Sequence, residues 1–208
     1  MPNKPNPRRT RSPGRALSDD ELAGVIGAAY TVNEASALIV VAMGRLGLRV
    51  GEALALRRGD FDLSTGLVTI ERSRDRDGAA RPLKGRYEGD RRVIPLPQSV
   101  RDAYARQTDL QDSTPISGDL FVTSRSTPLI YNNWRKRQWT RIIDEANMGH
   151  AVPHDLRHTC ITRLFIVGRW TPAEVQAFVG HTDARVTLEI YSHVNPATLP
   201  VPSDPGIG

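Results

Sequence analysis

Apolar residues change their spacing twice along this chain, and this change limits the folds that are open to it. Ser18 and Glu21 have the Ser-x-x-Glu spacing of a helix capping box. Leu22, Val25 and Ile26 follow at helical intervals. The helices expected in this first part of the chain cover residues 18–29, 33–47 and 50–56.

Short β-type runs follow these helices. Leu67–Ile70 and Arg92–Leu96 are rich in β-branched residues and are separated by segments that contain glycine and charge, which predicts strands of a small antiparallel sheet. Helical spacing then returns over residues 99–108, 131–146, 154–167, 172–179 and 184–191. The expected fold is α+β and mainly α-helical, with a small three-stranded antiparallel sheet inserted after the first helices.

Composition narrows the class of protein. Of the 208 residues, 39% are hydrophobic and 25% are charged, which is enough apolar material for a core and unlike a disordered or fibrous chain. The single cysteine, Cys160, excludes an intramolecular disulfide and a four-cysteine metal site, and we expect it to be a small buried group. The longest apolar run, residues 37–43, is far shorter than the ~20 residues of a membrane span. We therefore expect no membrane contact and a cytoplasmic location.

Charge divides the chain into a basic start and a balanced remainder. The sequence has 28 Lys and Arg against 23 Asp and Glu, and the net charge is +5. Five of the bases lie in the first 16 residues, without an acid. We expect residues 1–17 to be a flexible basic linker, 18–194 to be one domain, and 195–208 to be a Pro/Gly-rich tail. We expect these first 17 residues to be too few to form a further helical domain.

The segment His154–Thr159 carries the most informative chemistry. His154 and Arg157 are three residues apart, so an imidazole and a guanidinium can meet one phosphate on one helix face. A competing interpretation is a zinc site, because His154 and His158 are four apart with Asp155 between them. A guanidinium beside the dication disfavours that interpretation.

Three other segments hold candidate site residues. Tyr191 can act as a covalent nucleophile where cations stabilise the developing charge, although a lone tyrosine more often packs in a core. His181 follows the glycine that ends an expected helix. Arg49 stands between two expected helices, where it can project into a cleft or pair with Glu52 at the surface.

In order and spacing, four motifs resemble the catalytic-domain signature of the tyrosine recombinases, the phage integrase family: Gly47-Leu48-Arg49-x-x-Glu52, His154-x-x-Arg157-His158-Thr159, Gly180-His181 and Tyr191-x-His193. The resemblance runs from about residue 18 to residue 193. It implies the fold of that catalytic domain and a site-specific DNA recombinase that needs no cofactor, no metal and no ATP.

The resemblance also implies a role for each candidate. Arg49 and Arg157 would hold the non-bridging oxygens of the scissile phosphate, with hydrogen bonds from His154 and His181. Tyr191 would attack the phosphorus and form a 3′-phosphotyrosine. Lys84, before the second β-type run, would be the general acid for the leaving 5′-oxygen, and Glu52 would orient Arg49 or a histidine. The seven residues between Lys84 and Arg92 make this hairpin longer than is usual in the family.

The expected partner is double-stranded DNA carrying attachment-type recombination sites, with self-association into a dimer or tetramer. Residues 121–141 contain bases without an acid, and the expected phosphate contacts are Arg135, Lys136, Arg137 and Arg141. We expect the tryptophans among them to lie in the core. Two alternatives remain at this point: a type IB topoisomerase, which uses a similar residue set, and a recombinase-like DNA-binding protein without catalysis.

Overall fold

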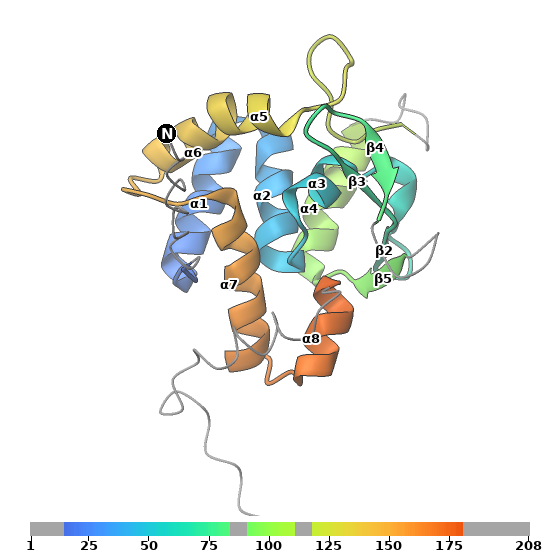
Figure 1. The fold of residues 1–208 in the computed structure, drawn as a ribbon, viewed down its shortest axis with the longest axis vertical. Coiled ribbons are helices and arrows are strands. Elements are labelled where there is room, and N and C mark those ends of the chain that lie inside the picture. Colours follow the sequence, from blue (N-terminus) through green and yellow to red (C-terminus); the bar gives the residue numbers. More distant parts are fainter. Residues whose placement is uncertain (1–14, 84–90, 111–117, 181–208) are drawn as a thin grey trace, which may run out of the picture.

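The computed structural model describes residues 15–83, 91–110 and 118–180 (Figure 1). Its first helices, α1 (Asp19–Val32) and α2 (Glu34–Leu46), pack against each other, and the short α3 (Val50–Leu54) follows. Glu21 donates its backbone N–H to the Ser18 hydroxyl, and Ser18 returns a backbone N–H to the Glu21 carboxylate, so the predicted capping box is confirmed. Helix α3 ends two residues earlier than predicted.

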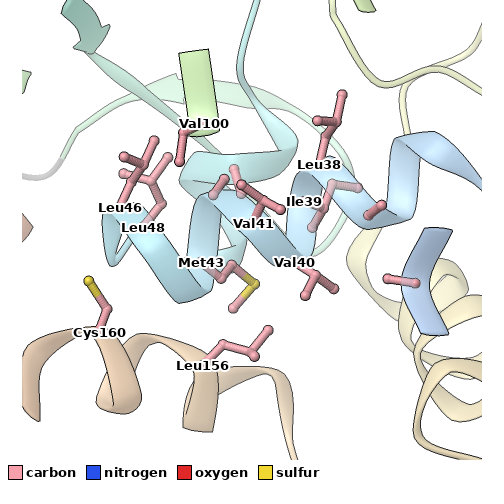
Figure 2. Close-up of a cluster of buried hydrophobic side chains, with 14 of the residues drawn as sticks. Leu38, Ile39, Val40, Val41, Met43, Leu46, Leu48, Val100, Leu156 and Cys160 are labelled. Carbon is pink, nitrogen blue, oxygen red and sulfur yellow. The ribbon is translucent and has the colours of Figure 1, made fainter. Parts of the chain in front are cut away.

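Helix α2 forms the centre of the core. All residues from Ser36 to Gly44 are buried, as expected of a helix that is apolar all round. Helix α1 packs on it, as does α7 (Pro153–Ile166). Figure 2 shows Leu156 and Cys160 of α7 pointing towards α2. Because α7 packs directly on α2, side chains on its inner face lie close to the end of α2.

The predicted three-stranded antiparallel sheet is confirmed. It consists of β1 (Phe61–Asp62), β2 (Leu67–Ile70) and β5 (Arg92–Pro95), in the order β1-β2-β5. Val68 lies opposite Ile94, and both side chains are buried. The two runs of β-type sequence are therefore the two longer strands, and they pair with each other.

A second antiparallel pair, β3 (Arg72–Arg74) and β4 (Ala80–Pro82), was not predicted. Each strand has only three residues; β3 is entirely polar and all residues of β4 are exposed, so neither shows the buried apolar alternation by which a strand is recognised. The strands are held by ladder hydrogen bonds and by packing of β3 on α3.

The remaining elements of the described chain are helical: α4 (Gln98–Leu110), α5 (Tyr131–Trp134), a π-helical turn (Arg135–Trp139), α6 (Thr140–Glu145), α7 and α8 (Pro172–Val179). In Figure 1, α5 and α6 lie across one end of α1 and α2, and α8 lies towards the opposite end. No helix of the described residues is long and apolar enough to cross a membrane. The helix expected at 184–191, the basic start up to residue 14 and the tail from 195 lie outside the described residues.

The segment 131–146, predicted as one helix, contains a π-helical turn. Trp134 and Trp139 are five residues apart, which on an α-helix turns them about 140° away from each other. A π-turn brings positions five apart onto one side. Both tryptophans are thereby buried, with ring centroids 5.9 Å apart, which confirms that they belong to the core. Their Nε1 atoms donate to Ser36 Oγ and to the carbonyl oxygen of Ala151, each at 3.1 Å.

Candidate functional site

The candidate site lies where the chain leaves α2 and enters α3. Gly47 ends α2 with φ at +65°, and Arg49 caps α3. The backbone nitrogen of Arg49 donates to Glu52 Oε2 at 3.0 Å, and Arg49 Nη1 donates to Glu52 Oε1 at 2.9 Å. Only 1% of the Glu52 side chain is exposed, against 43% of the Arg49 side chain. A buried carboxylate thus fixes both the backbone and the side chain of an arginine that reaches solvent.

Arg157 reaches the same place from α7. It is 1% exposed, and its Nη1 donates to the carbonyl oxygen of Gly47. Within the described residues, its Nη2 has no hydrogen-bond partner. Burial, reinforced by the positive charge of Arg49, lowers the pKa of Arg157 to about 9, so the guanidinium keeps its charge at neutral pH. A buried donor without a partner is costly, and a bound anion would satisfy it.

Arg92 of β5 is the third arginine of the site, and sequence reasoning missed it. Its Nη2 donates to Glu52 Oε2 at 2.7 Å, and its Nε donates to the carbonyl oxygen of Phe178 at 3.1 Å. The sequence held a signal for it: Arg92 is two and four residues before Ile94 and Leu96, so it lies on the same face of the strand as these two buried side chains. A charge on the buried face of a strand needs a partner, and here that partner is Glu52.

The three arginines determine the ionisation of Glu52. Burial by itself would raise the pKa of this carboxyl group, but the charges of Arg92, Arg49 and Arg157 outweigh it and hold the pKa below its ordinary value. Glu52 is therefore ionised at neutral pH. Three cations around one anion leave an excess of positive charge, which suits a site that binds a phosphate oxyanion.

His154 lies in the first turn of α7, exposed, one turn before Arg157. His158 is partly buried one turn later. Among the described residues, no three His, Cys, Asp or Glu side chains are grouped so that they could hold a metal ion. Cys160 is buried, as predicted, and burial raises the pKa of its thiol to about 12.

Three predicted site residues, Lys84, His181 and Tyr191, lie outside the described residues. The four bases expected to contact DNA are exposed on the π-helical turn and α6: Arg135, Lys136, Arg137 and Arg141. This basic surface is separate from the arginine cluster. Trp134 contacts Ser36 near the start of α2, whereas Arg157 contacts Gly47 just beyond its end. At 1.5 Å per helical residue, these two contact points on α2 lie roughly 16 Å apart along the helix axis.

The fold is that of the tyrosine recombinase catalytic domains. Superposition on the crystal structure of XerA recombinase gives a TM-score of 0.71 at 24% identity, over 93% of this chain and 63% of that one. The Tn1549 transposon integrase, solved in complex with transposon right end DNA, gives a TM-score of 0.76 at 21% identity, over 91% of this chain and 65% of that one. The catalytic domain of bacteriophage HP1 integrase gives a TM-score of 0.57 at 14% identity, over 88% of this chain and 89% of that one.

The chain belongs to the phage integrase family, whose model matches residues 16–198. Curated relatives include tyrosine recombinase XerC of Corynebacterium efficiens, 27% identical over 203 residues, and XerC of Halalkalibacterium halodurans, 31% identical over 156 residues. The matches cover 93% and 71% of this chain. They cover 59% and 46% of those proteins, so the chain spans about half the length of these relatives.

Proposed function

We propose that this chain is the catalytic part of a site-specific DNA recombinase, which cleaves and rejoins DNA strands through a 3′-phosphotyrosine. The observation that carries the proposal is the arrangement of Arg49 and Arg157. Arg157 is buried with a guanidinium nitrogen left without a partner among the described residues, and Arg49 is held next to it by Glu52. Two fixed guanidinium groups that converge in this way form a preorganised site for two phosphate oxygens.

Each candidate residue has a defined part in this reaction. The hydroxyl oxygen of Tyr191 attacks the phosphorus and gives its proton to a histidine of the site, while the bond to the 5′-oxygen breaks and Lys84 protonates that leaving oxygen. Arg49 and Arg157 bind the non-bridging oxygens, and His154 and His181 add hydrogen bonds. The 5′-hydroxyl of a partner strand then attacks the phosphotyrosine and releases the enzyme. The phosphodiester energy is kept in the protein–DNA bond, so the exchange needs no ATP.

The basic surface on the π-helical turn and α6 would contact the DNA backbone. It lies towards the start of α2 and the arginine cluster lies at the end of that helix, so we propose that both contact one duplex. The Tn1549 integrase, which shares the fold, was solved with DNA bound. Strand exchange joins two duplexes, which requires several catalytic subunits, so we propose that the chain assembles into a dimer or tetramer on its recombination sites in the cytoplasm.

Covalent trapping tests the proposal. A suicide DNA substrate, nicked beside the cleavage position, should leave a protein–DNA adduct that survives detergent. Tyr191→Phe should abolish the adduct because the nucleophilic oxygen is lost. Tyr30→Phe is the matched control, since Tyr30 is an exposed tyrosine of α1, and it should form the adduct at the wild-type rate.

Two outcomes would contradict the proposal. An adduct formed by the Tyr191→Phe protein would show that another residue is the nucleophile. Relaxation of plasmids without any site preference would identify a type IB topoisomerase instead of a recombinase.

A further inference from the structure

We propose that Arg92 is a positioning residue of the cleavage reaction. Together with Arg49 it holds the Glu52 carboxylate, so that Glu52 orients Arg49 without neutralising the site. This inference rests on the proposed function, because it concerns the same phosphate-binding arginines.

Each of the two Glu52 carboxylate oxygens accepts hydrogen bonds from both arginines. Oε1 accepts from Arg49 Nη1 at 2.9 Å and from Arg92 Nη1 at 3.4 Å. Oε2 accepts from the backbone nitrogen of Arg49 at 3.0 Å and from Arg92 Nη2 at 2.7 Å. Arg92 thus presents the two-pronged geometry of a bidentate pair, whereas Arg49 contributes one guanidinium nitrogen. Among the described residues the Arg49 guanidinium makes no further hydrogen bond, so the rest of it is available to a ligand.

Arg92 also ties this carboxylate to the end of α8. Its Nε donates to the carbonyl oxygen of Phe178 in the last turn of that helix. Gly180, the next residue after α8, has φ at +69°, and a Cβ placed there would lie 2.7 Å from Arg92 Nη1. The glycine therefore permits the guanidinium to lie against the helix end. In the sequence, this helix end leads directly into His181, so Arg92 joins α3, β5 and α8 at one point.

Charge gives Arg92 its second effect. Glu52 is almost fully buried, so its negative charge acts on Arg49 and Arg157 with little screening by water. With Arg92 present, this negative charge is partly balanced by the Arg92 guanidinium. Without Arg92, both carboxylate oxygens would compete with the phosphate for Arg49, and the site would lose one positive charge.

A double-mutant cycle between Arg92→Leu and Glu52→Gln tests this role, with inorganic phosphate as the probe and calorimetry as the readout. Arg92→Leu should weaken phosphate binding by about 10- to 100-fold, as expected for the loss of a group that orients a ligand-binding residue. Adding Glu52→Gln to Arg92→Leu should recover about tenfold, because the unbalanced negative charge is gone. Arg106→Leu, at an exposed position of α4, removes the same charge outside the site and should bind like the wild type.

A purely structural role for Arg92 would give no such recovery, so additive losses would overturn the inference, as would an unchanged affinity in Arg92→Leu. If the leucine variant does not fold, Arg92→Lys replaces it. This substitution keeps the charge and loses the two-pronged geometry, with an expected loss of about threefold to tenfold; an affinity equal to the wild type's would also overturn the inference.

The trapping assay separates this inference from the proposed function. If the variants show the recovery in phosphate binding but the wild-type protein forms no adduct with DNA, the proposed function is contradicted and the role of Arg92 at the phosphate site is supported. Protein that forms the adduct but shows no recovery in the cycle would contradict the role of Arg92 alone.

Discussion

At the scale of single residues, Glu52 shows how burial and charge combine in this site. Its carboxylate has almost no contact with water, yet three arginines keep it ionised. Removing one partner from a buried ion pair leaves the others with uncompensated charge, which is more costly than the pair is favourable. Glu52 therefore contributes to the stability of the fold as well as to the orientation of Arg49.

We predict that Glu52→Gln lowers the free energy of unfolding at pH 7 by about 3 kcal/mol. The folded-state pKa of Glu52 lies below its ordinary value of 4.5, so the carboxylate stabilises the fold above that pH. This contribution declines as the pH falls below 4.5 and is lost below the folded-state pKa. The difference between variant and wild type should narrow accordingly in urea unfolding measured from pH 7 to pH 3.

Glu145→Gln is the control for this prediction, because Glu145 is exposed at the end of α6. Its effect should stay within about 0.5 kcal/mol. A Glu52→Gln difference that does not change with pH would contradict the assigned ionisation.

At the scale of the elements, the end of α8 depends on a backbone conformation that suits glycine. We predict that Gly180→Ala lowers the free energy of unfolding by roughly 1–2 kcal/mol, because φ of +69° is unfavourable for alanine and its Cβ would press on Arg92. Gly24→Ala in α1 should have the opposite sign, since its Cβ would meet no atom within 4 Å and alanine favours the helix. Thermal unfolding of both variants and the wild type measures the two changes in stability. Two shifts of the same sign would contradict the backbone argument.

The elements also show where local sequence stops being informative. The spacing of apolar residues predicts α1, α2, α7 and α8 because each buries one side against a neighbour or is buried all round. It does not predict the π-helical turn Arg135–Trp139. That turn exists because Trp134 and Trp139 must both enter the core, a requirement set by Ser36 and Ala151 in other segments.

At the scale of the whole molecule, the position of the positive charge matters more than its sum. The structure changes one expectation for the basic start: Arg15 forms a bidentate pair with Glu21 of α1, at 2.8 and 3.0 Å. Arg15 therefore belongs to the helix start and not to a free linker. The other four bases of the basic start all lie within the first 14 residues: Lys4, Arg8, Arg9 and Arg11.

We predict that deletion of residues 2–14 weakens DNA binding and makes it less dependent on salt. Each base that neutralises a phosphate contributes about 0.9 to the slope of log K against log salt, so the slope should fall by about 3 to 4 if all four bases contact DNA. Measuring the DNA affinity of both proteins at several salt concentrations between about 50 and 200 mM gives the two slopes. A chain with the same four bases replaced by glutamine should behave like the deletion, and an unchanged slope in either would refute the prediction.

Sequence alone determined most of the helices of the described chain, which two runs pair as the main strands, and that Arg49, Glu52 and Arg157 are candidates within a known family pattern. These conclusions follow from local spacing, since a helix or strand displays its faces within a few residues. Only the tertiary structure decided that Arg92 joins Glu52, and that Arg157 reaches the end of α2 with one nitrogen left free in the described chain. Those contacts join residues 40 and 110 positions apart, and they depend on how α7, α8 and β5 pack around α2 and α3.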